Sequence, residues 1–161
     1  MTIIKYETPT EKLLQLEGEV IFLAGPTVRH HQPHLISWRN SAVKFLQDKN
    51  YSGTVIIPEF EIPVKTSDFD VPMWEYEGLK RADKIVVWLP RTEEMIGLTT
   101  NFEMGFWVAR AQEKVFYGRP DNAYRISYTD AMWKKLCQEN NLDRQIFNNL
   151  ENLLEAIINK K

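Results

Sequence analysis

Residues 84–111 read KIVVWLPRTEEMIGLTTNFEMGFWVARA, and one loop in this stretch joins a strand signal to a helix signal. Lys84 to Leu89 ends in a continuous apolar run, which is typical of a strand buried on both faces of a parallel sheet. Phe102 to Ala111 has the periodicity of a helix. In α/β proteins such strand-to-helix loops carry much of the chemistry, and this one delivers a carboxylate, Glu103, at the start of the helix.

The same alternation of strand and helix signals extends through most of the chain. Apolar runs that end at Gly or Pro indicate short buried strands, and apolar residues at helical spacing indicate the helices between them. Residues 1–18 have only weak apolar anchors and are interpreted as a partly ordered lead-in segment. We expect strands at residues 20–24, 54–57, 84–89, 114–117 and 124–126, and helices at 33–49, 72–82, 100–112, 129–139 and 144–159.

This order of elements predicts one α/β domain over residues 1–161. Its core is a five-stranded parallel sheet with helices on both faces. With the predicted strands numbered along the chain, we expect the flavodoxin-like (Rossmann-like) order 2-1-3-4-5. Ligands of such sheets bind where strands one and three diverge at their carboxyl ends. Loops 24–33 and 90–99 are therefore expected to face each other across one crevice.

The composition argues against several classes of partner. There are 20 Lys and Arg residues against 22 Asp and Glu, a net charge of −2, so no basic excess favours nucleic acid. No window approaches the roughly 20 apolar residues of a membrane span. The single Cys137 excludes an internal disulfide and fits a reducing compartment. We expect a cytoplasmic protein that binds a small molecule.

Two interpretations of Glu103 remain open from the local sequence. Thr100 to Glu103 matches a capping box, in which Thr100 caps the helix and Glu103 reaches back to its backbone N–H. Alternatively, a carboxylate at the positive end of a helix is favoured in its ionised form and can attack an acetal carbon in the crevice. Thr99 and Asn101 could hold a sugar hydroxyl or orient the carboxylate.

Further candidates are Glu75, Trp74 and the turn Gly25-Pro26-Thr27. Glu75 is either a first-turn residue favoured by the helix dipole or a ligand and proton shuttle for a nucleoside. Trp74 is either a core residue or a platform on which a base stacks. The turn that follows the first predicted strand is either a plain turn or the mouth of the crevice.

Several motifs with well-defined chemistry are missing from the sequence. The Gly-x-Gly-x-x-Gly, Walker and Gly-x-Ser-x-Gly patterns do not occur, which argues against dehydrogenases, kinases and α/β-hydrolases. Arg29, His30 and His31 form either a solvated loop or a contact for a phosphate group. The two histidines have no third ligand at zinc-like spacing, so we expect no metal site.

Three blocks of sequence together resemble the nucleoside 2-deoxyribosyltransferase family. They are Ile21 to Pro26, Trp74-Glu75 with Ala82 to Val87, and Gly97 to Gly105, in this order. Trp38-Arg39, Gly118-Arg119-Pro120 and the Gly-Leu-Thr-Thr-x-x-Glu signature resemble one branch of that superfamily, and the resemblance spans about residues 19–120.

The resemblance implies a flavodoxin-like sheet, no metal or cofactor, and a symmetric homo-oligomer whose neighbouring subunit completes the site. It aligns Glu103 with the nucleophilic Glu of the family, Glu75 with a sugar-binding carboxylate that is usually Asp, and Gly25-Pro26 with the floor of the nucleoside site. Better-known members carry an Asp six residues before the nucleophile, which helps to protonate the base. This chain has Gly97 there, and Glu93 or Glu94 of the same loop could replace the Asp.

The leading hypothesis is an enzyme of nucleotide salvage that cleaves or transfers at the N-glycosidic bond of 2′-deoxynucleosides or their monophosphates. Glu103 would form a covalent deoxyribosyl ester, Glu75 and Asn101 would hold the sugar, and aromatic residues near Trp74 would stack on the base. A 2-deoxy sugar suits this chemistry because its oxocarbenium-like transition state is easier to reach. The alternative is a non-catalytic nucleoside- or nucleotide-binding module, which the absence of the Asp favours. A third possibility is a structural or partner-binding protein that uses the apolar stripe from Ile146 to Ile158 as an interface, although we expect this stripe to pack on the sheet or to build a homo-oligomer.

Overall fold

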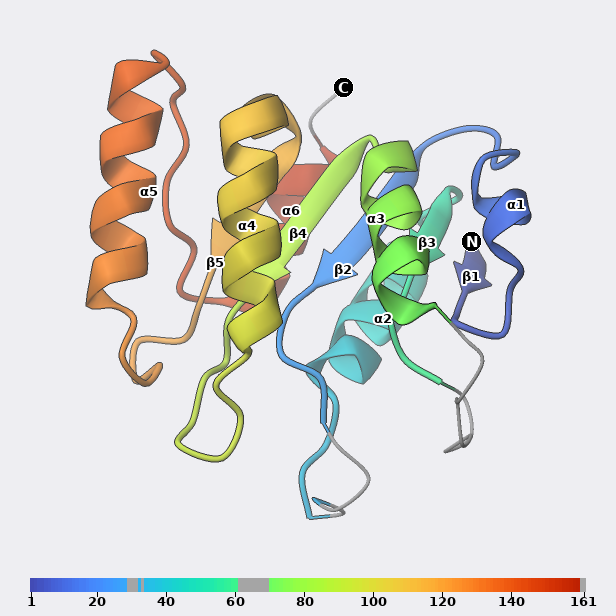
Figure 1. Ribbon diagram of the computed structural model, residues 1–161, viewed down its shortest axis with the longest axis horizontal. Coiled ribbons are helices and arrows are strands. Elements are labelled where there is room, and N and C mark those ends of the chain that lie inside the picture. Colours follow the sequence, from blue (N-terminus) through green and yellow to red (C-terminus); the bar gives the residue numbers. More distant parts are fainter. Residues whose placement is uncertain (29–31, 33, 61–69, 160–161) are drawn as a thin grey trace.

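Five parallel strands form one sheet with the order β1-β3-β2-β4-β5 (Figure 1). The computed structural model describes residues 1–28, 32, 34–60 and 70–159. Because the strands are parallel, their carboxyl ends share the lower edge of the sheet in Figure 1, where the loops after β2 and β4 lie. The strands are β1 (Thr2–Ile4), β2 (Val20–Ala24), β3 (Thr54–Ile56), β4 (Lys84–Trp88) and β5 (Val115–Gly118).

Helices cover both faces of the sheet and bury two apolar layers. One layer joins the sheet to α1, α3, α4 and α5 and is built around Trp74, Trp107 and Trp133. The other joins it to α2 and α6. The helices are α1 (Thr10–Leu13), α2 (Trp38–Asp48), α3 (Val71–Arg81), α4 (Leu98–Ala111), α5 (Ser127–Glu139) and α6 (Leu150–Ile158), with the short 3₁₀ helix η1 (Gln112–Lys114) after α4.

The α/β flavodoxin-like class is confirmed, whereas the predicted place of the fifth strand is wrong. The order β3-β2-β4-β5 reproduces the first four predicted strands. The fifth strand comes from the lead-in segment, where Thr2–Ile4 pairs with β3 at the opposite edge. Residues 124–126 form a turn instead, since Arg125 has a φ of 46° that is incompatible with a strand. A three-residue edge strand carries too few apolar positions to be recognised.

Two predicted helix boundaries are also wrong. The helix expected over residues 33–49 begins at Trp38, with Ser37 as its cap, and the helix expected over 144–159 begins at Leu150, with Asn149 as its cap. The apolar stripe of α6 packs inside the monomer, because Leu153, Leu154 and Ile157 are fully buried against the sheet and α2. Among the described residues, no helix is both long and apolar enough to cross a membrane.

Gly25, at the carboxyl end of β2, allows a close approach that no other residue would permit. A Cβ atom there would lie 2.3 Å from the carbonyl oxygen of Trp88 and 2.8 Å from the Trp38 ring. Gly105, in the middle of α4, has open space at the same position.

We therefore predict opposite effects for two Gly-to-Ala variants. Gly25→Ala should lower the free energy of unfolding by about 3 kcal/mol, because backbone atoms have to move. Gly105→Ala should raise it by about 0.5–1 kcal/mol, because Ala is the better helix residue. Urea denaturation followed by circular dichroism measures both. Equal stability of the Gly25→Ala variant and the wild type would contradict the packing described for β2.

Candidate active site

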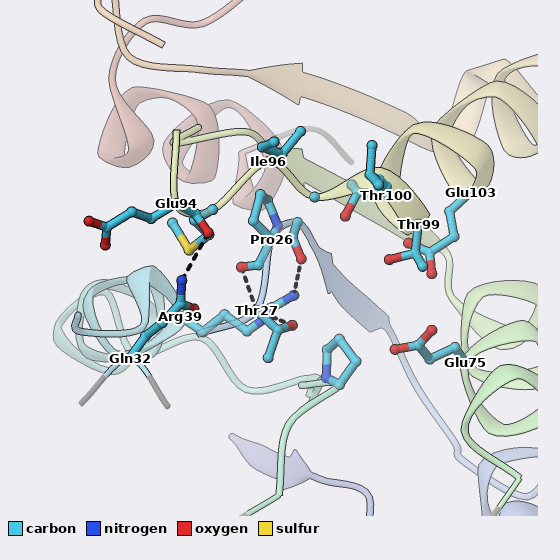
Figure 2. A pocket seen from close by; sticks show the side chains of 15 residues that line it. Pro26, Thr27, Gln32, Arg39, Glu75, Glu94, Ile96, Thr99, Thr100 and Glu103 are labelled. Carbon is cyan, nitrogen blue, oxygen red and sulfur yellow. Dashed lines mark hydrogen bonds between the residues drawn. The ribbon is translucent and has the colours of Figure 1, made fainter. Parts of the chain in front are cut away.

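A cavity of about 450 Å³ opens at the carboxyl edge of the sheet, between the loops after β2 and β4 (Figure 2). One end lies between α3 and α4 and holds two carboxyl groups. The other end is lined by the loop before α4 and by Gln32. The lining residues are Gly25, Pro26, Thr27, Gln32, Arg39, Pro58, Glu75, Glu94, Met95, Ile96, Gly97, Leu98, Thr99, Thr100 and Glu103.

Glu75 of α3 and Glu103 of α4 point toward each other across this end of the cavity (Figure 2). Burial, together with the charge and the hydrogen bond of Glu75, raises the pKa of Glu103 to about 8, while Arg39 opposes the rise. Near neutral pH, Glu103 is therefore mostly protonated and shares its proton with Glu75. A buried carboxyl group whose pKa is raised beside a second carboxyl group is typical of sites that perform acid–base or nucleophilic chemistry.

Tyr6 contacts this pair from the segment that follows β1. Its hydroxyl donates a hydrogen bond to Oε1 of Glu75. Its ring is 7% exposed and packs against Phe60 and Trp74, with centroids 4.6 and 4.8 Å away. The N-terminal segment, expected to be a lead-in, therefore reaches the centre of the site.

Arg39 of α2 holds the turn that forms the floor of the cavity. Its guanidinium is buried and donates to the carbonyl oxygens of Leu23, Gly25 and Pro26, at 2.9, 2.7 and 3.3 Å. It also donates to Oγ1 of Thr27 at 3.3 Å and to Oε1 of Glu59 at 2.8 Å. Trp38 adds a bond from its indole nitrogen to the Pro26 carbonyl oxygen, at 3.2 Å. These hydrogen bonds fix the backbone of the turn at Gly25 and Pro26.

Gly97 ends the loop after β4 and packs against the same turn. Its φ is 67°, in the left-handed region, and a Cβ atom there would lie 2.6 Å from Cγ of Pro26. An Asp at this position would be both strained and crowded. The loop geometry therefore fits Gly97 and not the Asp that the resemblance leads one to expect at this position.

Helix α4 begins one turn earlier than the capping-box interpretation requires. Gly97 is the N-cap residue and Leu98 the first helical residue, so Thr100 lies inside the helix and Glu103 lies in its second turn. Among the described residues, no side chain caps this end. The capping interpretation of Glu103 is therefore wrong, and its carboxyl group faces Glu75 instead.

Residues 18–121 match the family model described as "Nucleoside 2-deoxyribosyltransferase like". The chain belongs to this nucleoside 2-deoxyribosyltransferase-like family. The match covers α2, α3, α4 and the strands β2 to β5, and it thus includes Glu75, Glu103 and the Gly25 turn. Tyr6 lies outside it. A search of curated proteins finds no significant match to the chain.

Six of the eight residues expected in the site line the cavity of this family member. They are Gly25, Pro26, Thr27, Glu75, Thr99 and Glu103. Trp74 is not among the lining residues, because it is fully buried and its indole nitrogen donates to the Thr8 carbonyl oxygen at 2.8 Å. The expectation that Trp74 stacks on a base is therefore wrong.

Asn101 also lies elsewhere. Its side-chain oxygen accepts a hydrogen bond from Arg91, and it lines a separate groove between α4 and α5. A role in holding the sugar is therefore wrong for Asn101, because residues two apart on a helix point to different sides.

The carboxylates expected to replace the missing Asp are not aimed at Glu103. Glu94 lines the cavity, but its carboxylate points away from Glu103 and pairs with His34 at 2.9 Å (Figure 2). Glu93 is exposed and is not a lining residue. The phosphate contact considered for Arg29, His30 and His31 lies outside the described residues, as does the histidine pair considered for a metal. Among residues 1–28, 32, 34–60 and 70–159, no group of three metal-ligating side chains occurs.

Two central residues, Tyr6 and Arg39, are not identified as site residues from the sequence. Tyr6 carries no local signal, because its role depends on a strand pairing between residues far apart in the chain. Arg39 has a weak signal, since it interrupts the apolar positions Trp38, Ala42 and Leu46 that α2 buries. A charged residue on the buried face of a helix usually has a specific partner.

The raised pKa of Glu103 predicts a pH-dependent stability. The folded protein holds this proton up to about pH 8, whereas the unfolded chain releases it near the ordinary value of 4.5. The stabilisation is thus complete below pH 4.5 and is lost as the pH rises to 8. Glu103→Gln, whose amide can still donate to Glu75, should be more stable than the wild type at pH 8.5, by on the order of 2 kcal/mol, and equally stable near pH 4.

Thermal unfolding monitored across this pH range measures the difference. Glu93→Gln, in an exposed loop position, is the matched control and should follow the wild type at every pH. A Glu103→Gln variant with the same pH dependence as the wild type would contradict the shared proton.

Proposed function

We propose that the protein cleaves or transfers at the N-glycosidic bond of 2′-deoxynucleosides through a covalent ester with Glu103. The observation that carries this proposal is the pair of carboxyl groups, Glu75 and Glu103, at the end of a cavity at the carboxyl edge of the sheet. Family membership supports it, because the matched region contains both residues. Thr99, exposed at the same end of the cavity, is available to bind a sugar hydroxyl.

The reaction has two steps. An ionised oxygen of Glu103 forms a bond to C1′, while the C1′–N bond breaks and its electron pair leaves with the base, which takes up one proton from solvent. Water or a second base then attacks C1′, loses one proton, and releases the Glu103 carboxylate. Glu75 accepts a hydrogen bond from a sugar hydroxyl in both steps. Hydrolysis and transfer differ only in the acceptor.

The charge of the cavity favours a neutral nucleoside over a monophosphate. Among the described lining residues, the ionisable side chains are Arg39, Glu75, Glu94 and Glu103, so three of the four are carboxyl groups. Arg39 is already paired with Glu59 at 2.8 Å. A phosphate dianion would therefore meet carboxylates without a free cation among these residues. Pro26, Met95 and Ile96 offer an apolar surface to a base.

A non-catalytic binding module is the second candidate, and the glycine at position 97 favours it. The loop geometry leaves no room there for an acid that would protonate the departing base. The two candidates differ in one outcome, which is release of free base.

We predict that the wild type releases base from 2′-deoxynucleosides and that Glu103→Gln lowers the rate by about 10³-fold or more. Glu75→Gln should lower it by about 10²-fold. Since attack requires ionised Glu103, kcat/KM should rise about tenfold per pH unit up to pH 8 and then level off. Chromatography of the released base measures all three, with or without an acceptor base.

Three controls separate the alternatives. A 2′-fluoro nucleoside should leave a sugar adduct on Glu103 that is visible by mass spectrometry and absent from Glu103→Gln. The 5′-monophosphates should react more slowly than the nucleosides, and a preference for monophosphates would instead implicate Arg29, His30 and His31. If no base is released while nucleosides still raise the melting temperature, the protein is a binding module.

We also propose that the chain forms a homo-oligomer through the face formed by α3 and α4. A groove of about 410 Å³ lies on this face, and seven of its ten lining residues are apolar or aromatic, the others being Thr99 and the carboxyl pair. Phe102 in this groove is 78% exposed. Outside the groove, Met73 of α3 and Leu98 of α4 are 50% and 73% exposed. Exposed apolar surface of this kind is typical of an interaction site.

Phe102→Glu should therefore shift the protein toward the monomer in analytical ultracentrifugation, because the charge would be buried in the contact. Tyr128→Glu, at an exposed aromatic residue of α5, is the matched control and should not change the sedimentation. A wild type that is monomeric at all concentrations would contradict this proposal without affecting the roles of Glu75 and Glu103.

A further inference from the structure

The N-terminal segment is an addition to the part of the chain that matches the family. The match begins at residue 18, yet β1 pairs in register with β3, from Thr2 opposite Thr54 to Ile4 opposite Ile56. The backbone N–H of Tyr6 then donates to the carbonyl oxygen of Glu59, at 3.4 Å. These contacts bring Tyr6 beside the carboxyl end of β3, next to the cavity.

The Tyr6 side chain is held in one orientation by packing and by its hydroxyl group. Phe60 and Trp74 contact the ring, which is 7% exposed. The hydroxyl donates to Oε1 of Glu75. Burial and the charge of Glu75 raise the pKa of Tyr6 far above its ordinary value, so the phenol remains a proton donor throughout the working pH range.

A hydrogen bond donated to a carboxylate stabilises its ionised form and fixes its rotamer. Within the part of the chain that the structure describes, Glu75 of α3 and Arg39 of α2 act on Glu103, and Glu75, Glu103 and Arg39 act on Tyr6. Arg39 is largely neutralised by its ion pair with Glu59. Tyr6 is therefore a donor that acts on the pair directly, through its hydrogen bond to Glu75.

We propose that Tyr6 is a positioning residue that orients Glu75 and lowers the affinity of the Glu75–Glu103 pair for its proton. The proposal rests on the proposed function of that pair. It assigns to the N-terminal segment, which lies outside the family match, a part in the chemistry of the site. Tyr6 donates its hydrogen bond to Glu75 and acts through that residue.

The test is Tyr6→Phe, which keeps the packing of the ring and removes only the hydroxyl. The rise of kcat/KM with pH should move upward by about one unit, because the pair without its donor holds its proton more tightly. At pH 7, kcat should fall about tenfold, while KM stays within about twofold. Tyr117→Phe is the matched control. The fully buried Tyr117 donates a hydrogen bond to Asp130 at 2.7 Å, and it does not line the cavity. It should leave the pH profile unchanged.

A second measurement makes the proposal independent of turnover. Carbon-13 NMR of Glu-labelled protein follows the titration of Glu103, assigned by its loss in Glu103→Gln, and the midpoint should be higher in Tyr6→Phe. If the wild type releases no base, the proposed function fails, but this titration still tests Tyr6. An unchanged midpoint in Tyr6→Phe would overturn the proposal, whether or not its melting temperature falls.

Discussion

The buried guanidinium of Arg39 is the interaction on which the candidate site depends. A cation without solvent is costly unless it is paired and hydrogen-bonded, and Arg39 satisfies this requirement with Glu59 and with the backbone and Thr27 hydroxyl at the end of β2. Because its acceptors lie between Leu23 and Thr27, the side chain fixes the path of that turn. Gly97 packs on Pro26 of the same turn and begins α4, so the position of Glu103 follows from that of Arg39.

Arg39 and the Glu75–Glu103 pair lie in opposite electrostatic surroundings. Arg39 makes five hydrogen bonds, one of them to its acidic partner Glu59, whereas Glu75 and Glu103 are two acids that face each other. The hydrogen bonds of Arg39 stabilise the framework of the site. The contact between Glu75 and Glu103 raises the free energy of their ionised form. A purely structural role would not require such a pair, whereas catalytic sites commonly contain one.

The fold was largely predictable because its central strands are short apolar runs bounded by Gly or Pro. The parallel order around β2 and β4 then follows from the rules of α/β connections, and it places the Gly25 turn and Glu103 in one crevice. The edge strand β1 was missed, because three residues with a half-exposed pattern resemble any loop. Pairing between Thr2 and Thr54 depends on the folded chain, not on local sequence.

The residues of the site were likewise predictable only in part. Glu103 and Glu75 were identified correctly as cavity residues because a motif and a resemblance pointed to them, but their contact could not be read from spacing. Trp74 and Asn101 were expected to line the cavity but do not, because residues one or two positions apart on a helix point in different directions. The sequence pattern predicts the start of α4 one turn too late, because the N-cap residue is a glycine in the left-handed conformation and not the expected Thr100.

The edge position of β1 also has a consequence for the order in which the protein matures. Residues 2–4 precede their partners in β3 by some fifty positions, so this pairing closes a long loop. A three-residue strand at a sheet edge gains little from local contacts and opens more readily than the centre of the sheet. The framework around β2 and β4 can therefore form before the N-terminus docks. The segment that carries Tyr6 is then among the last to take its place, and the site acquires this residue as a finishing step of folding.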